Sequence, residues 1–164
     1  MKNIKKPLAL ALMLTMLLAL VACSEMLSLV TTTDTNQGNS DVMGVNTVNI
    51  TIGDNVLTAT LAENSSVDAL KEALSEGPIT VNMRDYGNME KVGSLGMDLP
   101  RNDQQITTEA GDIILYQGSA FVIYYAPNSW NFTRLGKIDN ITAEELRAIL
   151  GDGNVTITLS LPQE

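Results

Sequence analysis

The 164-residue chain is predicted to be mainly β, as a small closed or nearly closed barrel of about eight short strands with two short helices at its ends. Three observations predict this fold. Apolar and polar residues alternate along several short runs after residue 46, which is typical of half-buried strands. Two neighbouring runs, 113–116 and 121–125, are apolar on both faces. Two further segments carry apolar residues on one helical face only.

The first half of the predicted barrel begins with a hairpin and a helix. Residues 48–52 and 57–61 alternate on either side of the turn sequence Gly53-Asp54-Asn55, which predicts a β-hairpin. The side chains of 64–66 (Asn-Ser-Ser) offer N-cap oxygens to a short helix, and Gly77-Pro78 ends it.

The middle of the chain is predicted as a strand, a long loop and a second hairpin. Residues 79–83 alternate, whereas the glycine-rich 84–111 segment is predicted to be loop with one short strand around Val92. The two apolar runs 113–116 and 121–125 flank Gln-Gly-Ser and predict a hairpin with neither face simply solvated.

The last elements are a capped helix and a closing strand. Thr142 and Glu145 have the spacing of a capping box at the start of a helix, and Gly151 fits the C-cap at the end of that helix. Residues 155–161 then alternate strictly and predict the final strand.

The N-terminus resembles a bacterial lipoprotein signal. Three lysines precede an almost unbroken apolar run at 7–22, which is short for a membrane span of roughly 20 residues. The run ends in Leu-Val-Ala followed by Cys23, the only cysteine, and this resembles a lipobox. The resemblance implies cleavage before Cys23 and its acylation, hence a lipid anchor on the outer side of a bacterial membrane, in the cell envelope. The alternative is an ordinary signal peptide with a cysteine near its cleavage site.

The chain is therefore divided into three parts. Residues 1–22 are the predicted lipoprotein signal peptide, 23–46 the lipidated cysteine and a flexible tether, and 47–164 the barrel domain. The tether is rich in Thr, Asn, Gly and Ser and lacks apolar periodicity. Twenty-odd such residues reach about 25 Å, enough to lift a domain clear of lipid headgroups.

Composition excludes several classes of function. The net charge of −9 becomes −12 once residues 1–22, with three lysines and no acid, are removed, so binding of nucleic acid through its phosphates is not expected. The chain has no histidine, and a lipidated Cys23 is not a metal ligand. Zinc, haem and thiol-redox sites are therefore excluded, as are Ser-His and Cys-His nucleophiles, and no cofactor is expected.

Two stretches resemble the bacterial cyclophilin-like domain family. They are "ITVNMRDYGNMEKVGSLGMDLP" and "AGDIILYQGSAFVIYY", the latter followed closely by "FTRLGKI", and the resemblance covers roughly Thr47 to Leu161. It implies a cyclophilin-like barrel of eight strands with helices at its ends. Cyclophilins are peptidyl-prolyl isomerases that hold an Xaa-Pro peptide in an apolar groove beside a catalytic arginine. This chain departs from that pattern, because it has no Phe-His-Arg and no Gln-Phe-Phe stretch.

In principle, one arginine side chain is enough to catalyse prolyl isomerisation. The barrier of ~18–20 kcal/mol to prolyl rotation comes from amide resonance, and a guanidinium in a dry apolar groove can lower it without an acid, a base or a metal. Arg84, Arg101 and Arg134 are the candidates outside the predicted helices. Catalysis, if present, is assigned to Arg134 or Arg84.

The candidate ligand site centres on Trp130, Phe132 and Arg134. If this stretch is extended, the three side chains point to one side, where rings and a guanidinium can hold a peptide. Alternatively the rings cover a barrel end and Arg134 pairs with a carboxylate. Tyr116 and Tyr86 are further candidates, whereas the rings of 121–125 are expected in the core.

Four carboxylates offer a weaker alternative. A pair of them would suit glycoside hydrolysis, but on an acidic surface they are expected to be solvated. They are Asp98, Asp103, Glu109 and Asp112.

Three functions therefore remain open. The first is a membrane-tethered, non-catalytic module that binds a peptide, a small apolar ligand or an envelope partner protein. The second is a prolyl isomerase with a non-standard arginine site, and the third is a purely structural envelope domain. The first two predict an apolar groove near Trp130 with an arginine at its rim, and the third predicts that side chains fill it.

Overall fold

The computed structural model describes residues 46–163, which form nine strands and two helices. The predicted signal peptide, Cys23 and all but the last residue of the tether lie outside the described residues. The strands are β1 (Thr47–Ile52), β2 (Asn55–Leu61), β3 (Ile79–Tyr86), β4 (Glu90–Ser94), β5 (Gln104–Thr107), β6 (Asp112–Tyr116), β7 (Ala120–Tyr124), β8 (Ser129–Ile138) and β9 (Val155–Ser160), and the helices are α3 (Ser65–Ser75) and α4 (Ala143–Leu150).

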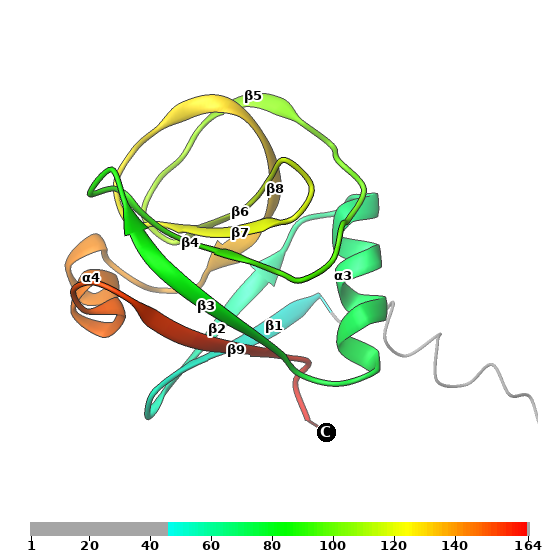
Figure 1. The fold of residues 1–164 in the computed structure, drawn as a ribbon, viewed down its shortest axis with the longest axis horizontal. Helices are drawn as coiled ribbons and strands as arrows, with labels where there is room; N and C mark the ends of the chain where they lie inside the picture. The colour runs from blue at the N-terminus through cyan, green and yellow to red at the C-terminus, as the bar shows by residue number, and fades with distance from the viewer. Residues whose placement is uncertain (1–45, 164) are drawn as a thin grey trace, which may run out of the picture. The chain divides into compact units, whose positions relative to one another are not determined.

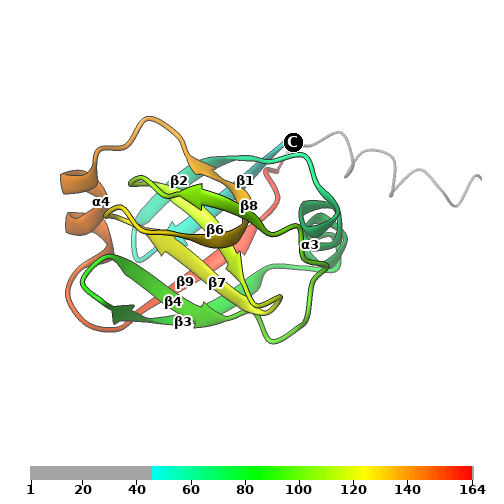
Figure 2. The same ribbon diagram turned by 90° about the horizontal axis from the view of Figure 1, so that it is seen from above.

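Eight of the strands form a closed antiparallel barrel. Their order is β2-β1-β9-β3-β4-β7-β6-β8, and pairing of β2 with β8 closes the ring. The ninth strand, β5, pairs only with β8, outside the ring. Helices α3 and α4 lie at opposite ends of the barrel (Figures 1 and 2). The predicted fold class is confirmed.

Both helices begin where their capping residues predict. The side chain of Asn64 accepts hydrogen bonds from the backbone N–H groups of Ser66 and Val67. Thr142 and Glu145 form the predicted reciprocal capping box, and Gly151 ends α4 with φ +63°. No helix among residues 46–163 is long and apolar enough to cross a membrane.

The β6–β7 hairpin is buried on both faces, as its sequence predicts. Ile113, Leu115, Phe121 and Ile123 face the main core, which fills the barrel. The alternate residues point the other way and form a second, smaller cluster. That cluster contains Ile114, Val122, Tyr124 and Phe132.

A strand covers this outer face. The first four residues of β8, 129–132, leave the barrel and pair with β5. The remainder of β8 pairs with β6 and β2. Figure 1 shows β8 and β5 arching over β6 and β7. The arch brings Phe132 into the second cluster.

The predicted 84–111 loop is partly wrong. The strand around Val92 is confirmed as β4, but β3 continues to Tyr86 because Arg84, Asp85 and Tyr86 pair with β4. Residues 104–107 form β5, which the sequence did not predict. This strand contains a single partly buried apolar residue, Ile106, and so lacks the alternation that marks the others.

Candidate functional site

A hollow of about 470 Å³ lies over the outer face of β4, β6 and β7, and we call it the aromatic hollow. Its volume is in the range of small-molecule and peptide-side-chain sites. Five rings line it: Tyr86, Tyr116, Tyr124, Trp130 and Phe132. Arg84, Glu90 and Asn128 supply its charged and amide groups. The hollow is therefore apolar with few polar groups, as ligand sites commonly are.

The rings differ in exposure. Phe132 and Tyr124 are buried, with ring centroids 5.6 Å apart, and Tyr116 meets Phe132 edge-on at 6.2 Å. These three rings form one cluster in the lining of the hollow, and Tyr116 is its exposed member. Trp130 and Tyr86 are 60% and 61% exposed, far more than large rings usually are. Their exposed faces are free to stack on a ligand.

Arg84 is the guanidinium of this hollow. The β3–β4 register sets Arg84 opposite Val92 and Tyr86 opposite Glu90, so all four side chains share one face. Among the lysine and arginine side chains of residues 46–163, Arg84 is the one that makes no hydrogen bond, ion pair or ring contact. All five of its N–H donors are available to a ligand.

Glu90 is a buried carboxylate in the same hollow. It is 7% exposed, and burial raises the pKa of its carboxyl, an effect that a hydrogen bond from Tyr124 partly opposes. Asn128 Nδ2 donates to Tyr124 Oη at 3.2 Å and completes the network. Burial also raises the pKa of Tyr124, which keeps the hydroxyl protonated and donating to Glu90. A charge buried at a cost in stability is typical of a functional site.

Glu90→Gln is expected to raise the free energy of unfolding at pH 7. Folding raises the pKa of Glu90 above its value of about 4.5 in the unfolded chain. The folded protein therefore has its full stability below that pH, where Glu90 is protonated in both states, and loses stability as pH rises through the pKa of Glu90 in the folded protein. Glutamine resembles the protonated acid and still accepts from Tyr124. Urea unfolding from pH 4 to 8 should show a gain for the variant that grows with pH. A variant less stable than the wild type at pH 7 would contradict this.

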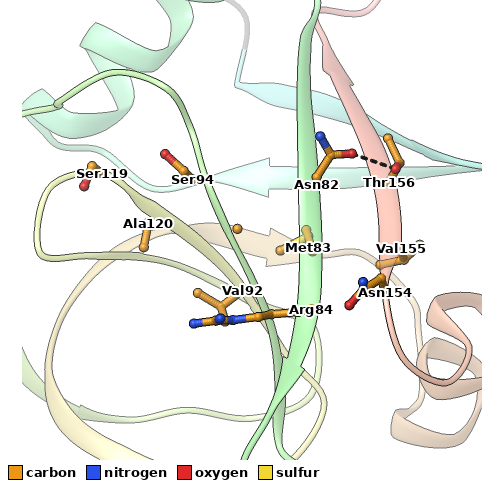
Figure 3. A pocket seen from close by; sticks show the side chains of 11 residues that line it. Asn82, Met83, Arg84, Val92, Ser94, Ser119, Ala120, Asn154, Val155 and Thr156 are labelled. Carbon is orange, nitrogen blue, oxygen red and sulfur yellow. Dashed lines mark hydrogen bonds between the residues drawn. The ribbon is translucent and has the colours of Figure 1, made fainter.

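A second hollow of about 750 Å³ adjoins the first, and we call it the donor hollow. The two share Arg84, Val92 and Ala120. Figure 3 shows Arg84 beside Val92, with Ser94 and Ser119 on one side and Asn82, Asn154 and Thr156 on the other.

The structure brings together most of the residues predicted for the site. Trp130, Phe132, Tyr116, Tyr86 and Arg84 all line the aromatic hollow. Of the remaining rings, Phe121 and Tyr125 lie in the main core as expected. Tyr124 does not, because it faces the hollow.

Arg134 departs from the prediction. Its Nη1 donates to the buried carboxylate of Asp112 at 2.6 Å, and it lines neither hollow. A β-bulge between Ile113 and Ile114 sets Arg134 opposite Ile114. Arg134 therefore follows the alternative expectation and pairs with a carboxylate. The arginine that lies beside the rings is Arg84.

Glu90, Tyr124 and Asn128 were missed by reasoning from sequence. Glu90 stands opposite Tyr124 across β4 and β7, and this pairing buries it. The one available signal was the charged pair Glu90-Lys91 at the start of a strand between glycines.

The four carboxylates considered for hydrolysis do not form a pair in either hollow. Asp103 pairs with Arg101, Glu109 with Lys137, and Asp112 with Arg134. The pairing with Lys137 lowers the pKa of Glu109, and the hydrogen bond from Arg101 does the same for Asp103. Within residues 46–163 no three acidic or cysteine side chains are grouped to hold a metal ion.

Comparisons with known proteins agree with this architecture. The solution structure of a hypothetical protein from Archaeoglobus fulgidus is similar, with a TM-score of 0.53 and 14% identity, over 72% of this chain and 95% of that one. At this identity the likeness shows the fold alone. The comparison with curated proteins found no similar sequence. The model of the cyclophilin-like family matches residues 50–160, so the chain belongs to the cyclophilin-like family.

Proposed function

We propose that this protein is a binding module whose ligand is an apolar, proline-containing segment of a peptide or partner protein. The single observation that supports it is the aromatic hollow, where the exposed rings of Trp130 and Tyr86 lie with the buried rings of Tyr124 and Phe132. A purely structural domain would fill this space with side chains, as noted above. Proline fits such a site because its ring is apolar, rigid and free of an N–H donor.

The polar groups of the hollow suit a peptide backbone. Arg84 and Asn128 supply N–H donors to peptide carbonyl groups, while the rings contact the side chains. A small number of polar groups among rings fixes the orientation of a ligand, which gives specificity.

Prolyl isomerisation is the second candidate function, and the position of Arg84 favours it. The guanidinium of Arg84, which has no partner within residues 46–163, lies beside an apolar hollow and can donate to the prolyl nitrogen or its carbonyl as the amide twists. No acid, base or metal is needed for this step. The proposal therefore assigns any isomerase activity to Arg84.

Exchange NMR tests both functions at once. Capped Xaa-Pro peptides are mixed with the full-length protein in neutral detergent micelles, and cis and trans signals are followed. Broadened or shifted peptide signals without faster exchange support the binding module. Faster exchange that Arg84→Gln abolishes establishes the isomerase instead. Unchanged signals at millimolar peptide overturn both.

We also propose that Cys23 tethers the module to a membrane in the bacterial cell envelope, on its outer side. The support is the lipobox-like sequence that ends at Cys23. Radiolabelled palmitate should label the wild type and not Cys23→Ser, and only the wild type should fractionate with membranes. Equal labelling of the two proteins would refute the tether.

A further inference from the structure

The two hollows form one groove with chemically different halves. They share Arg84, Val92 and Ala120, so a ligand that fills the aromatic hollow borders the donor hollow directly. The aromatic half contains five rings and one buried acid, Glu90. The donor hollow has a different, polar lining and therefore suits a different part of the ligand.

Among residues 46–163, no acidic side chain lines the donor hollow. This is unusual in a chain with 19 acidic and only 10 basic residues. Its polar side chains are two amides, three hydroxyls and one guanidinium: Asn82, Asn154, Ser94, Ser119, Thr156 and Arg84. The lining is therefore rich in neutral donors around one positive charge.

Several of these donors remain free for a ligand. Thr156 Oγ1 donates to Asn82 Oδ1 at 2.8 Å, which leaves the amide N–H groups of Asn82 unused (Figure 3). The hydroxyl oxygen of Ser94 accepts from Gly96 N, so its own proton is free to be donated. Arg84 has no partner among the described residues. A ligand that accepts hydrogen bonds and carries negative charge fits this set.

We propose that the donor hollow binds a carboxylate of the peptide whose apolar segment occupies the aromatic hollow, and that Arg84 is the residue that selects it. This inference rests on the proposed function. The carboxylate comes from an acidic side chain beside the proline or from the C-terminus of the peptide. Glu90 lies two residue pairs further along the β3–β4 hairpin, opposite Tyr86, and lines only the aromatic half.

Calorimetry on the full-length protein in neutral detergent tests this. The ligands are three Phe-Pro peptides: one capped with an adjacent Glu, one capped with Gln instead, and the Gln peptide with a free C-terminal carboxylate. A hydrogen-bonded charge pair is expected to improve binding by about tenfold or more over the capped Gln peptide. The acidic peptide that shows the gain identifies the source of the carboxylate.

Arg84→Gln should abolish the gain, so that the acidic peptide and the capped Gln peptide bind this variant with equal affinity. Arg84→Lys should retain part of the gain, since the charge remains without the planar fork. The matched control is Arg101→Gln, an exposed arginine that lines neither hollow and should keep the full gain.

Two outcomes overturn the inference in different ways. Equal affinity for all three peptides, or a gain that persists in Arg84→Gln, refutes carboxylate selection and leaves the binding module standing. Failure of every peptide to bind refutes the binding module, and carboxylate selection with it.

Discussion

Replacing Lys91 with methionine is expected to lower the free energy of unfolding by about 3 kcal/mol, the lower end of the range for removing one partner of a buried ion pair. Lys91 is 1% exposed, and its Nζ donates to the carbonyl oxygens of Gly151 and Gly153, each at 2.7 Å. It also pairs with Asp85 Oδ1 at 2.8 Å. One ammonium thus joins the β3–β4 hairpin to the end of α4.

Methionine keeps the length and apolar stem of the side chain, so the loss comes from polar groups. Two carbonyls lose their donor, and Asp85 keeps only Tyr125 Oη and Gly153 N as donors. Asp85 is partly exposed and can be solvated, which places the expected loss at the lower end.

The loss should shrink in acid. The hydrogen bond from Lys91 lowers the pKa of Asp85 below 3.8, so its stabilisation is present above that pH and is lost as pH falls through the folded pKa. Urea unfolding of wild type and variant at pH 7 and pH 3 measures this. Lys137→Met, which breaks the exposed pair with Glu109, is the control and should cost much less than Lys91→Met, because solvent screens that pair. Equal losses in the two variants would contradict a structural role for Lys91.

Gly136→Ala is expected to destabilise the barrel by about 1–3 kcal/mol through overpacking at its closing seam. Gly136 on β8 pairs with Leu61 on β2, where the ring closes. A Cβ at Gly136 would lie 2.4 Å from the Thr60 carbonyl oxygen and 3.1 Å from Leu61 Cα, both backbone atoms. The two strands must therefore separate to admit it.

Urea unfolding of Gly136→Ala beside Gly53→Asn separates this clash from a general glycine effect. Gly53 lies in a turn with φ +55° and has no atom within 4 Å of an added Cβ, and asparagine tolerates this backbone conformation. Gly53→Asn should therefore be nearly neutral. A Gly136→Ala protein as stable as the wild type would contradict the closed seam between β2 and β8.

The sequence predicts those strands of the barrel whose side chains alternate between the core and water. Alternation marks the strands at 48–52 and 155–160, since water on one side and the core on the other impose a period of two. The caps of both helices are also predictable, because each is formed by residues within a few positions of one another. β5 escapes prediction because its only partner is β8, outside the ring, and this pairing imposes no buried face on its four residues.

The site is less predictable, because its chemistry depends on pairings between distant strands. Trp130 and Phe132 are recognisable as rings two residues apart on one strand. Which arginine joins them depends on Asp112, 22 residues before Arg134, and on the bulge in β6, neither of which leaves a pattern in the sequence. Glu90 becomes a site residue only through its register with Tyr124 on β7.

The most direct test of the aromatic hollow as the ligand site is the fluorescence of Trp130, the only tryptophan in the chain. A capped Phe-Pro peptide is titrated into the full-length wild type, Tyr116→Ala and the control Val56→Ala, an exposed apolar residue on β2 outside the hollow. A saturable change in emission is predicted for wild type and control, with binding weakened about fivefold or more in Tyr116→Ala by loss of ring contact. Peptide binding detected by calorimetry without a change in Trp130 emission, or weakened equally by Val56→Ala, would contradict it.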